Sequence, residues 1–482
     1  MNERPNYPDV LLHINGRWRP ATDGRSSPVA NPSSGETIGS FAHASIADLD
    51  EALDAALSGF QAWSRVSAFD RSKRLRRAAD LLRERAEFVA RLLTLEQGKP
   101  LSEARTEIQA SADIIDWFAE EARRTYGRIV PARVPTARQL VVKQPVGPVA
   151  AFTPWNFPVS QLARKLAAAL AAGCSIIVKA AEETPAAPAE LVRAFVDAGL
   201  PNGAIALVFG TPSEISSHLI AHPVVRKVTF TGSTPVGKQL AALAGQHMKR
   251  VTMELGGHAP VIVLKDADLA RAATTTIASK FRNAGQVCIA PTRFLIEEPV
   301  YDKFVSLFSE MAAKICVGDG LSPDTTMGPL ANERRVAAIE GFIADAVERG
   351  AERVCGGGRI GNSGFFMEPT VLAGVPRDAR AMNEEPFGPL ALMVPMRSLD
   401  DILVEANRLP YGLAAYAFTQ SAASASRIGE EIASGMVSIN HAGLAFPEVP
   451  FGGINDSGYG TEGGADAIEG YLNSKFITHL QI

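Results

Sequence analysis

The chain has 482 residues, of which 46% are hydrophobic and 21% are charged, and its formal net charge is −4. This length exceeds one ordinary hydrophobic core and predicts two or three domains, while the slightly acidic balance gives no reason to expect a nucleic-acid partner. We find no uncharged apolar run of about 18 residues and no apolar core of signal-peptide length near the start, so we predict neither a membrane span nor a secretory leader.

The four cysteines, Cys174, Cys288, Cys316 and Cys355, lie far apart and form no CxxC pair. This spacing argues against a disulfide framework and against a zinc site, and it favours a reducing compartment. We therefore expect a cytoplasmic protein without a bound metal. A lone cysteine is more often a small buried hydrophobic residue than a catalyst, so Cys288 by itself does not identify a reaction.

Along the chain, the first patterned stretch is helical and the next is extended. The basic run RSKRLRR (71–77) falls where apolar residues recur at helical spacing, so its arginines are interpreted as the wet face of an amphipathic helix. Residues 129–147 combine prolines with alternating apolar residues, which suggests a β-hairpin that stands off the main body. SKFITHL (474–480) is a strand candidate of the same sort. Exposed strand edges usually find a partner, so we expect a homodimer or homotetramer.

The middle of the chain alternates short apolar runs with helical patterns. One helix is predicted from about Val159 to Gly173, since glycine is a natural residue just past a helix end. Another is predicted to open with Thr184 as its N-cap and Pro185 as its first residue. This alternation is typical of βαβ units and predicts a parallel sheet covered on both faces. The other predicted elements here are strands at 148–152, 175–179, 204–209 and 227–230, and a helix near 213–221.

A second set of alternating elements follows. It begins with a strand at 259–264 and a helix from about Asp268 to Phe281, and we place a domain boundary near 253–257. The predicted fold class is therefore α/β, with two α/β domains and a small β extension.

Two motifs of the first predicted domain suit a nucleotide. In KVTFTGSTPVGKQL (227–240) a strand enters a turn of small residues, where Ser233 or Thr234 can cap a helix and free N–H groups can bind a pyrophosphate. The GxGxxG fingerprint is absent, so an ordinary capped turn is the alternative. Lys179 and Glu182 follow the end of a predicted parallel strand, the usual place for ligands in such sheets. A carboxylate there can accept hydrogen bonds from ribose hydroxyls and oppose a 2′-phosphate; the alternative is a solvated charged loop.

Three further motifs carry candidate functional side chains. Asn156 lies in the proline-bracketed loop AFTPWNFP (151–158) and can donate to a developing oxyanion, although turn asparagines are common. Glu254 ends an apolar stretch in TMELGGHAP (252–260), where partial desolvation can raise its pKa toward that of a general base; an exposed glutamate is the alternative. In NEEPFGP (383–389), Glu385 can hold sugar hydroxyls and Phe387 can wall a flat ring.

The ordered set TPWNFP, KxxE, FTGSTPVG, MELGGHAP, GQVC, EEPFGP and PFGG resembles the aldehyde dehydrogenase superfamily, from HINGRW (13–18) to the C-terminus. Within that superfamily, QLARKLAAALAAGC, FRNAGQVC and EGGADAIEGYLNSKF are most similar to succinate-semialdehyde and 2-oxoglutarate-semialdehyde dehydrogenases. The resemblance implies a Rossmann-like, parallel-sheet NAD-binding domain (1–128 and 146–253), an α/β catalytic domain (254–458) and a small β oligomerisation extension (129–145 and 459–482).

The resemblance also implies a role for each candidate side chain. Cys288 matches the nucleophile, Glu254 the general base, and Asn156 the side chain that joins the Cys288 backbone N–H in an oxyanion hole. The implied cofactor-binding residues are Lys179 and Glu182 at the adenosine ribose, Gly232 and Ser233 at the pyrophosphate, Glu385 and Phe387 at the nicotinamide ribose and ring, and Thr153, Pro154, Trp155 and Leu255 elsewhere in the pocket.

The implied reaction is NAD-dependent oxidation of an aldehyde through a Cys288 thioester. Glu254 argues for hydrolysis to a free acid, because coenzyme A-acylating members typically lack that glutamate. Glu182 favours NAD over NADP, although use of both is possible if its side chain turns away.

The expected substrate is a small acidic aldehyde. Arg164 follows Asn156 by about two helical turns and Arg282 precedes Cys288 by six residues, so each can point into the aldehyde channel, where a guanidinium suits a carboxylate. Structural ion pairs are the alternative. We predict oxidation of succinate semialdehyde to succinate, with 2-oxoglutarate semialdehyde or a broad range of aldehydes as alternatives.

The chain length of the substrate stays open because Phe446 and Pro447 stand where succinate-semialdehyde enzymes often place a serine. Ala290 stands where some relatives have a second cysteine, so no disulfide switch is expected.

Overall fold

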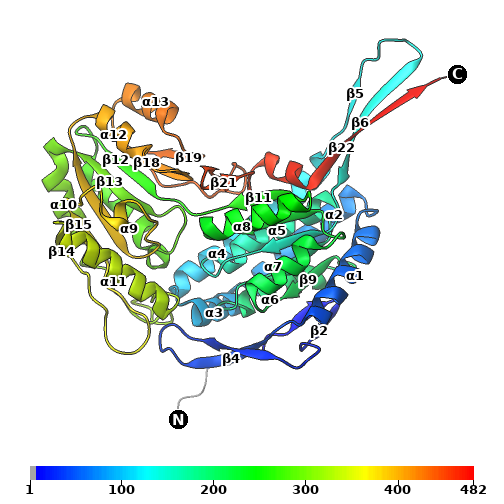
Figure 1. The fold of residues 1–482 in the computed structure, drawn as a ribbon, viewed down its shortest axis with the longest axis horizontal. Helices are drawn as coiled ribbons and strands as arrows, with labels where there is room; N and C mark the ends of the chain where they lie inside the picture. The colour runs from blue at the N-terminus through cyan, green and yellow to red at the C-terminus, as the bar shows by residue number, and fades with distance from the viewer. Residues whose placement is uncertain (1–6, 482) are drawn as a thin grey trace.

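Two β-sheets organise residues 7–481, the part of the chain that the computed structural model describes (Figure 1). The first sheet has eight strands in the order β2-β1-β9-β8-β7-β10-β11-β21. Its strands from β9 to β11 run parallel, and β1, β2 and β21 join antiparallel at the edges. The predicted parallel sheet is therefore confirmed. Its strands are β1 (Leu12–Ile14), β2 (Arg17–Arg19), β7 (Val149–Phe152), β8 (Ile176–Lys179), β9 (Ile205–Val208), β10 (Lys227–Thr231), β11 (Arg250–Glu254) and β21 (Gly458–Tyr459).

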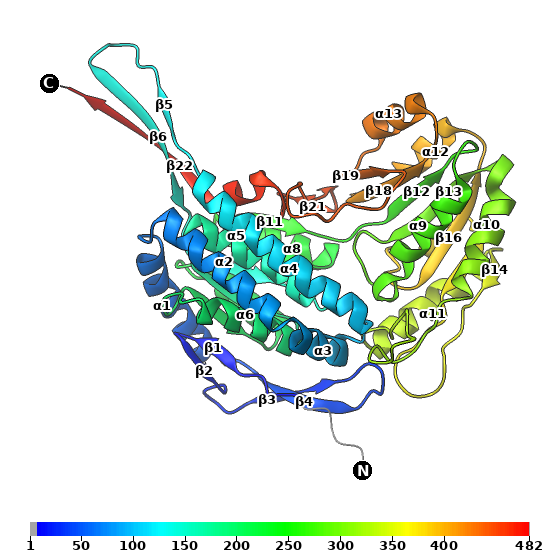
Figure 2. The ribbon, with the colours of Figure 1, turned by 180° about the vertical axis from the view of Figure 1, so that it is seen from behind.

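Strands β7 to β10 are buried along their whole length, and the sequences of β7, β8 and β9 are accordingly nearly unbroken apolar runs. Two packed groups of helices accompany this sheet, one of α1, α7 and α8 and the other of α2 to α6. Figure 2 shows the second group from its own side. The helices are α1 (Ile46–Trp63), α2 (Ala68–Glu84), α3 (Ala86–Gln97), α4 (Leu101–Glu121), α5 (Pro158–Ala172), α6 (Ala186–Asp197), α7 (Pro212–Ala221) and α8 (Thr234–Gln246).

The predicted end of α5 is confirmed, whereas the predicted start of α6 is wrong. Helix α5 ends at Gly173 as predicted, and Gly173 adopts a left-handed conformation with φ of 95°. The predicted cap of α6 is wrong, because Pro185 is the N-cap residue and the hydroxyl of Thr184 is buried without a partner. The carboxylate of Glu96, from α3, instead accepts the first two backbone N–H groups of α6, at 2.8 and 2.9 Å. A carboxylate at this position complements the positive end of the helix.

The second sheet has seven strands in the order β14-β15-β16-β13-β12-β18-β19, parallel except for β14. It forms a second lobe, at the left in Figure 1. Its strands are β12 (Ala259–Val263), β13 (Pro291–Glu297), β14 (Glu352–Cys355), β15 (Thr370–Ala373), β16 (Leu390–Met396), β18 (Ala414–Phe418) and β19 (Met436–Ile439). Its helices are α9 (Leu269–Phe281), α10 (Glu298–Ala312), α11 (Glu333–Glu348), α12 (Leu399–Ala406) and α13 (Ala422–Glu431).

The chain crosses from the first sheet to the second between the end of β11 at Glu254 and the start of β12 at Ala259. It returns near its end, where β21 pairs with β11. Segments 254–258 and 440–460 therefore run between the lobes. Two small sheets complete the fold: β3 (Ser26–Ala30) with β4 (Thr37–Ala42), and β17 (Tyr411–Gly412) with β20 (Ile454–Asn455).

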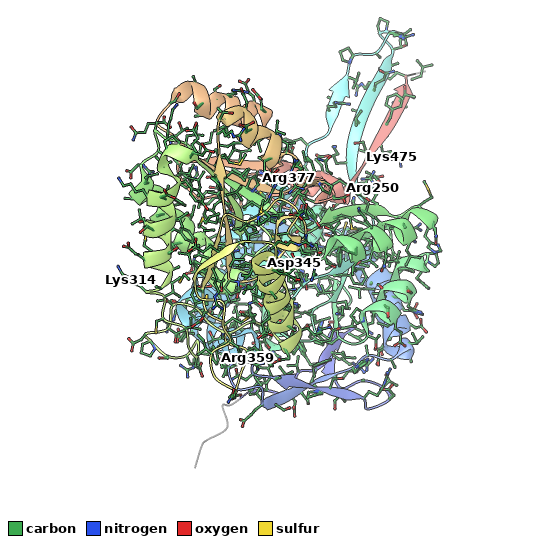
Figure 3. The ribbon with its side chains drawn as sticks, turned by 60° about the vertical axis from the view of Figure 1, so that its left-hand side comes forward. Arg250, Lys314, Asp345, Arg359, Arg377 and Lys475 are labelled. Carbon is green, nitrogen blue, oxygen red and sulfur yellow. The ribbon has the colours of Figure 1, made fainter. Side chains whose placement is uncertain are left out.

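An arm projects from the first lobe (Figure 1). It is a three-stranded antiparallel sheet of β5 (Arg128–Val130), β6 (Ala137–Pro145) and β22 (Leu472–Leu480), as the hairpin and C-terminal strand predictions required. Apolar side chains stand exposed on it, with Ile129 at 80% and Phe476 at 58%. At its base the guanidinium of Arg250 donates to the backbone oxygen of Leu472 at 2.7 Å, and Figure 3 shows Arg250 close to Lys475 there. Within residues 7–481, no helix combines the length and apolar character needed to cross a membrane.

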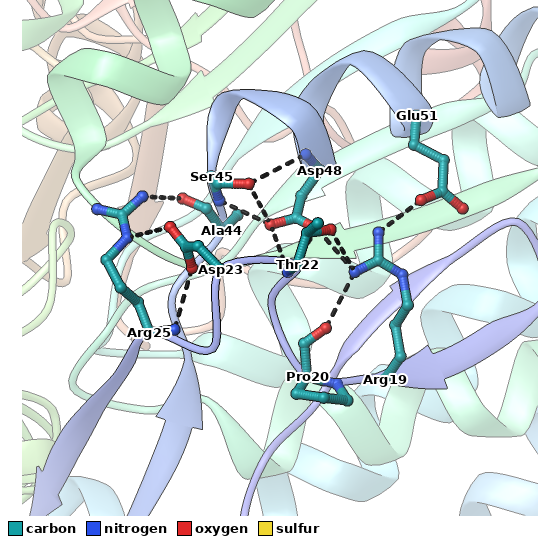
Figure 4. Close-up of polar contacts among 9 residues, drawn as sticks. All are labelled: Arg19, Pro20, Thr22, Asp23, Arg25, Ala44, Ser45, Asp48 and Glu51. Carbon is teal, nitrogen blue, oxygen red and sulfur yellow. Dashed lines mark hydrogen bonds and ion pairs between the residues drawn. The ribbon is translucent and has the colours of Figure 1, made fainter.

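A buried carboxylate fastens the N-terminal strands to α1 (Figure 4). The side chain of Asp48 is fully buried and accepts hydrogen bonds from Arg19 at 2.7 Å, from the hydroxyl of Thr22 at 2.6 Å and from the backbone N–H of Ser45 at 2.8 Å. Burial alone would raise the pKa of Asp48, but these hydrogen bonds outweigh it and lower the pKa to about 2. Asp48 therefore stays ionised and stabilises the fold over most of the pH range.

Replacing Asp48 by alanine should lower the free energy of unfolding by about 2–3 kcal/mol, because charge-assisted hydrogen bonds and a helix-capping contact are lost together. Urea unfolding at pH 7 measures this, with Glu51→Ala as the matched control, since Glu51 pairs with the same arginine at an exposed site and should cost under about 1 kcal/mol. The stabilising contribution is complete above about pH 4 and disappears as the pH falls toward 2, so the wild-type advantage should shrink on acidification. Equal midpoints for the two variants at pH 7 would contradict this role.

Candidate active site

A cavity of about 240 Å³ lies between the lobes, and Cys288 forms part of its wall. Helices α4 and α5 of the first lobe line one side, and the segment 282–289 of the second lobe lines another. The wall is largely apolar, but it also carries two arginines and two glutamates. Its lining includes Glu103, Glu107, Phe157, Arg164, Arg282 and Phe451.

The segment that leads to Cys288 is backbone-strained. Asn283, Ala284 and Gly285 all adopt left-handed conformations, with φ of 50°, 53° and 72°. A side chain at Gly285 would place a Cβ 2.1 Å from the backbone oxygen of Gly388, so only glycine fits there. Two consecutive non-glycine residues in this region cost of order 1–3 kcal/mol each, and such strain persists only where surrounding contacts impose it.

Hydrogen bonds join this strained turn to Asn156. The side-chain nitrogen of Asn156 donates to the backbone oxygen of Gln286 at 3.0 Å, and that of Asn283 donates to the backbone oxygen of Asn156, also at 3.0 Å. One hydrogen of the Asn156 amide remains to be donated to a ligand. Asn156 is 3% exposed and its side-chain oxygen has no partner among the described residues. The predicted oxyanion donor is thus fixed beside the loop that carries the predicted nucleophile.

Glu254 is buried at the end of β11, and neither of its carboxylate oxygens has a hydrogen-bond partner within residues 7–481. Burial, with the neighbouring carboxylate of Glu462, raises the pKa of Glu254 well above its usual value, while Lys165 and Arg164 act in the opposite direction. Lys165 forms an ion pair with Glu462 and donates to the hydroxyl of Thr231 at 2.7 Å. The partial desolvation expected from the sequence is therefore complete, and Glu254 has the environment of a weak acid that can hold a proton.

Cys288 is half-buried, unlike Cys174, which is fully enclosed. Burial of the sulfur and the nearby carboxylates of Glu385 and Glu254 raise the pKa of the Cys288 thiol to about 12, and the cation of Arg282 only partly offsets them. The thiol is therefore protonated in the protein alone at neutral pH. Reactivity requires a change in this electrostatic balance, since the thiolate is the nucleophilic form.

The carboxyl ends of neighbouring strands gather the predicted nucleotide-binding residues. Strands β8, β7 and β10 are adjacent in the sheet and end at Lys179, just before Thr153 and just before Gly232. Ligands of parallel sheets bind at this edge. Lys179 forms an ion pair with Glu182 there, and the hydroxyl of Thr153 is buried without a partner in the described chain. Ser233 occupies the N-cap of α8 but makes no capping bond, contrary to one predicted option, so the helix start keeps N–H groups for an anion.

The remaining predicted cofactor residues lie near residues 254–258, where the chain passes from the first lobe to the second, or in the loop after β7. The carboxylate of Glu385 accepts the backbone N–H of Gly257 at 3.1 Å, and burial raises its pKa to about 7. Phe387 has an unusual positive φ of 49° and meets Trp155 edge-on, with ring centroids 5.7 Å apart. Leu255 is buried against Gly237 of α8, where a Cβ would come within 2.2 Å of its side chain. Pro154 lies in the same loop as Thr153 and Trp155.

The two arginines predicted to bind the substrate both line the cavity, but they differ in burial and in hydrogen-bond partners. Arg164 is 5% exposed, donates to the backbone oxygens of Glu462 at 2.8 Å and Ala445 at 3.1 Å, and is therefore already held by protein groups. Arg282 is exposed, lies over the ring of Phe157 at 5.3 Å, and forms no ion pair with any described residue. Arg282 is the guanidinium free to receive a bidentate anion.

Sequence reasoning missed several buried polar residues around the site. Lys99, Glu107 and Gln97 contact the Asn156 loop or the strained turn, and Lys165 and Glu462 lie near Glu254. Each contact joins segments distant in the chain, so no local pattern indicates it. Among residues 7–481, no three His, Cys, Asp or Glu side chains cluster closely enough to hold a metal ion.

Comparison with known proteins matches residues 18–477 to a family described as the aldehyde dehydrogenase family. The chain is 50% identical to a 4-(hydroxymethyl)benzenesulfonate dehydrogenase of Comamonas testosteroni, over 98% of both chains. It is 42% identical to an NADP(+) succinate-semialdehyde dehydrogenase of Escherichia coli (strain K12), over 96% of both. The crystal structure of a succinate-semialdehyde dehydrogenase from Burkholderia pseudomallei has a TM-score of 0.97 at 40% identity, covering 100% of both chains.

The raised pKa of the Cys288 thiol predicts slow alkylation at neutral pH. With iodoacetamide, the rate at Cys288 should keep rising up to about pH 10, because the thiolate fraction grows with pH. In Glu385→Gln, which removes a carboxylate that raises the thiol pKa, Cys288 should react faster at pH 8. Peptide mass spectrometry separates Cys288 from the exposed Cys316. A plateau of the wild-type rate near pH 8 would refute the raised pKa.

Proposed function

Because the chain belongs to the aldehyde dehydrogenase family, we propose that it oxidises a carboxylate-bearing semialdehyde, succinate semialdehyde in the first instance, to the free acid with NAD(P)+. One observation carries the choice of substrate class. The unpaired guanidinium of Arg282 faces the same cavity as Cys288. A carboxylate can pair with it bidentately, whereas a neutral aldehyde offers this guanidinium no such partner.

Arg164 supports the same preference without a direct contact. Its charge is buried, and two of its five N–H donors already bind backbone oxygens. We therefore assign it the part of adding positive potential to the cavity. This divides the roles that the sequence analysis gave equally to the two arginines. Phe446 and Pro447, where a serine is often found in succinate-semialdehyde enzymes, leave Arg282 as the principal anchor.

A second substrate class has support of its own. The relative at 50% identity is named for a benzenesulfonate substrate, a sulfonate presents oxygens to a guanidinium much as a carboxylate does, and Phe157 and Phe451 flank the cavity. An aromatic sulfonate-bearing aldehyde therefore stands beside succinate semialdehyde and 2-oxoglutarate semialdehyde as a candidate.

In the proposed reaction, the Cys288 thiol loses its proton to the carboxylate of Glu254, which passes it to solvent, and the sulfur adds to the aldehyde carbonyl carbon to form a tetrahedral adduct. The remaining Asn156 amide hydrogen and the Cys288 backbone N–H donate to the new oxyanion, a contact made only as charge develops. A nicotinamide cofactor, when bound, would supply the acceptor for the hydride that leaves this adduct. Glu254 then takes a proton from the water that attacks the thioester, the carbon–sulfur bond breaks, and the acid and the free thiol result. Because the pKa of Glu254 is raised, this step should quicken as the pH rises.

The residues present fit a nicotinamide dinucleotide. The uncapped start of α8 would hold the pyrophosphate, Lys179 and Glu182 would hold the adenosine ribose, and Glu385 and Phe387 would hold the nicotinamide ribose and ring. The buried, unpartnered hydroxyl of Thr153 is a further donor at this edge. We propose NAD as the preferred cofactor, because the Glu182 carboxylate would oppose a 2′-phosphate.

These proposed positions support the domain division expected from the sequence. The first lobe, residues 1–128 and 146–253, would bind the cofactor, and residues 254–458 would supply the nucleophile and base. The exposed apolar side chains of the arm support assembly into a homodimer or homotetramer. The sparse, separated cysteines are consistent with the expected cytoplasmic location.

Purified protein should reduce NAD with succinate semialdehyde, 2-oxoglutarate semialdehyde or 4-formylbenzenesulfonate at a higher kcat/KM than with propanal. The panel is run with NAD and with NADP, and NAD should give the higher values. Cys288→Ala should abolish turnover with all aldehydes. If propanal equals or exceeds every anionic aldehyde, the proposed substrate class is wrong.

The same panel of aldehydes, measured with the Arg282→Ala variant, tests whether Arg282 binds the anionic group of the substrate. KM for the best anionic aldehyde should rise about 30- to 100-fold, the cost of leaving a charged partner unpaired, while KM for propanal changes less than about threefold. Arg271→Ala is the matched control, since Arg271 is an exposed arginine of α9, the helix that ends just before Arg282, and it does not line the cavity. Equal losses for anionic and neutral aldehydes would make Arg282 structural.

A further inference from the structure

The backbone oxygen of Asn156 is held by two donors inside the protein. The ammonium of Lys99 donates to it at 2.8 Å and the side chain of Asn283 donates to it at 3.0 Å. Asn283 is itself held by Gln97, whose amide donates to its side-chain oxygen at 2.8 Å. Gln97 is the last residue of α3, and Lys99 lies in the short link between α3 and α4. Neither segment carries any of the groups assigned to the reaction.

Lys99 is 1% exposed, and burial lowers the pKa of its ammonium. Its partner is the equally buried carboxylate of Glu107, at 2.6 Å. The other oxygen of Glu107 accepts the backbone N–H groups of Val159 and Ser160 at 3.0 and 3.2 Å, at the start of α5. The Lys99–Glu107 pair therefore holds the chain at Asn156 and just after it, at the start of α5. Isolated buried ion pairs contribute little net stability, so the pair needs another explanation.

The link that carries Lys99 is fixed against the second lobe. The backbone N–H of Leu101 donates to the oxygen of Gly320 at 2.9 Å. Side chains at Gly320 or Gly328 would place a Cβ 2.4 Å from the oxygen of Lys99 or 2.0 Å from that of Gly98, so the two backbones are in close contact. Lys99 thus extends from a segment anchored in the second lobe to the Asn156 loop of the first.

We propose that Lys99, fixed by Glu107 and assisted by Gln97 through Asn283, is a positioning residue for the oxyanion donor Asn156. It sets the Asn156 side chain at the correct distance from Cys288, which belongs to the other lobe. This proposal rests on the proposed function, because Asn156 must act on an oxyanion. A displacement of about 1 Å in such a group can cost about 100-fold in rate, and loss of an oxyanion donor costs 100- to 1,000-fold.

The test is a double-mutant cycle on the full-length protein, with Lys99→Met, Asn156→Ala and the combined variant. Two activities are measured: NAD-linked oxidation of the best aldehyde, and hydrolysis of p-nitrophenyl acetate without cofactor, which also forms an oxyanion at Cys288. Lys99→Met should lower kcat at least tenfold in both, with KM changed less than threefold. In the Asn156→Ala background, adding Lys99→Met should lower kcat by less than a further twofold, because no oxyanion donor remains to be positioned.

Two further variants cover misfolding of Lys99→Met, which leaves the Glu107 carboxylate buried alone. Lys99→Met/Glu107→Gln removes both charges and keeps an acceptor for α5. Gln97→Met removes no charge, and takes away the donor that supports Asn283 together with the acceptor of the Lys99 backbone N–H. Both should show the same kcat loss, which disappears in the Asn156→Ala background. Lys73→Met, at an exposed lysine of α2, should leave both activities unchanged.

The outcomes separate the two levels of the account. If Lys99→Met lowers kcat by the same factor with and without Asn156→Ala, the positioning role is wrong. It is also wrong if the loss is confined to the NAD-linked activity. Neither result bears on the proposed function. An inactive wild type, or an Asn156→Ala variant with full activity, would instead overturn the proposed function on which it rests.

Discussion

The hydrogen bonds between the Asn156 loop and the strained turn before Cys288 are the contact on which the rest of the site depends. Asn156 belongs to the first lobe and Cys288 to the second, and two hydrogen bonds join their loops. The side-chain amide of Asn156 donates to the backbone oxygen of Gln286, and the side chain of Asn283 donates to the backbone oxygen of Asn156. The left-handed conformations of Asn283 and Ala284 are unfavourable in isolation. Their persistence shows that the interface between the lobes determines the local backbone, with strain concentrated where the reacting group is presented.

The charges around this contact favour a protonated Cys288 thiol in the protein alone. Carboxylates from Glu254 and Glu385 lie in buried surroundings near the Cys288 thiol, and both disfavour ionisation of that thiol. A thiol kept neutral is protected from alkylation and oxidation. In the cavity wall, the guanidinium of Arg282 forms no ion pair with any described residue, and its positive charge partly offsets the effect of these carboxylates on the thiol.

Local patterns predicted the scaffold well, because each pattern reports on its own element. The buried strands β7, β8 and β10, the end of α5 at Gly173 and the start of α9 at Asp268 all follow from apolar runs and terminal residues. The expectation for Thr184 failed because Glu96, 90 residues earlier in the sequence, supplies the acceptor that α6 needs. The family resemblance named the candidate catalytic residues but gave Arg164 and Arg282 equal standing, since only the fold shows which guanidinium is already occupied. Lys99, Glu107 and Glu462 had no local signature, because a buried polar residue is explained by its partner and not by its sequence neighbours.

The central claim is that Cys288 carries an acyl group which Glu254 releases by activating water. Rapid-quench mass spectrometry of Glu254→Gln, mixed with NAD and succinate semialdehyde in a single turnover, tests it most directly. The account predicts a burst of NADH that matches the enzyme concentration, and a peptide containing Cys288 that gains the mass of one succinyl group and loses it with hydroxylamine. NADH release that continues at the wild-type steady rate, with no adduct on Cys288, would contradict it.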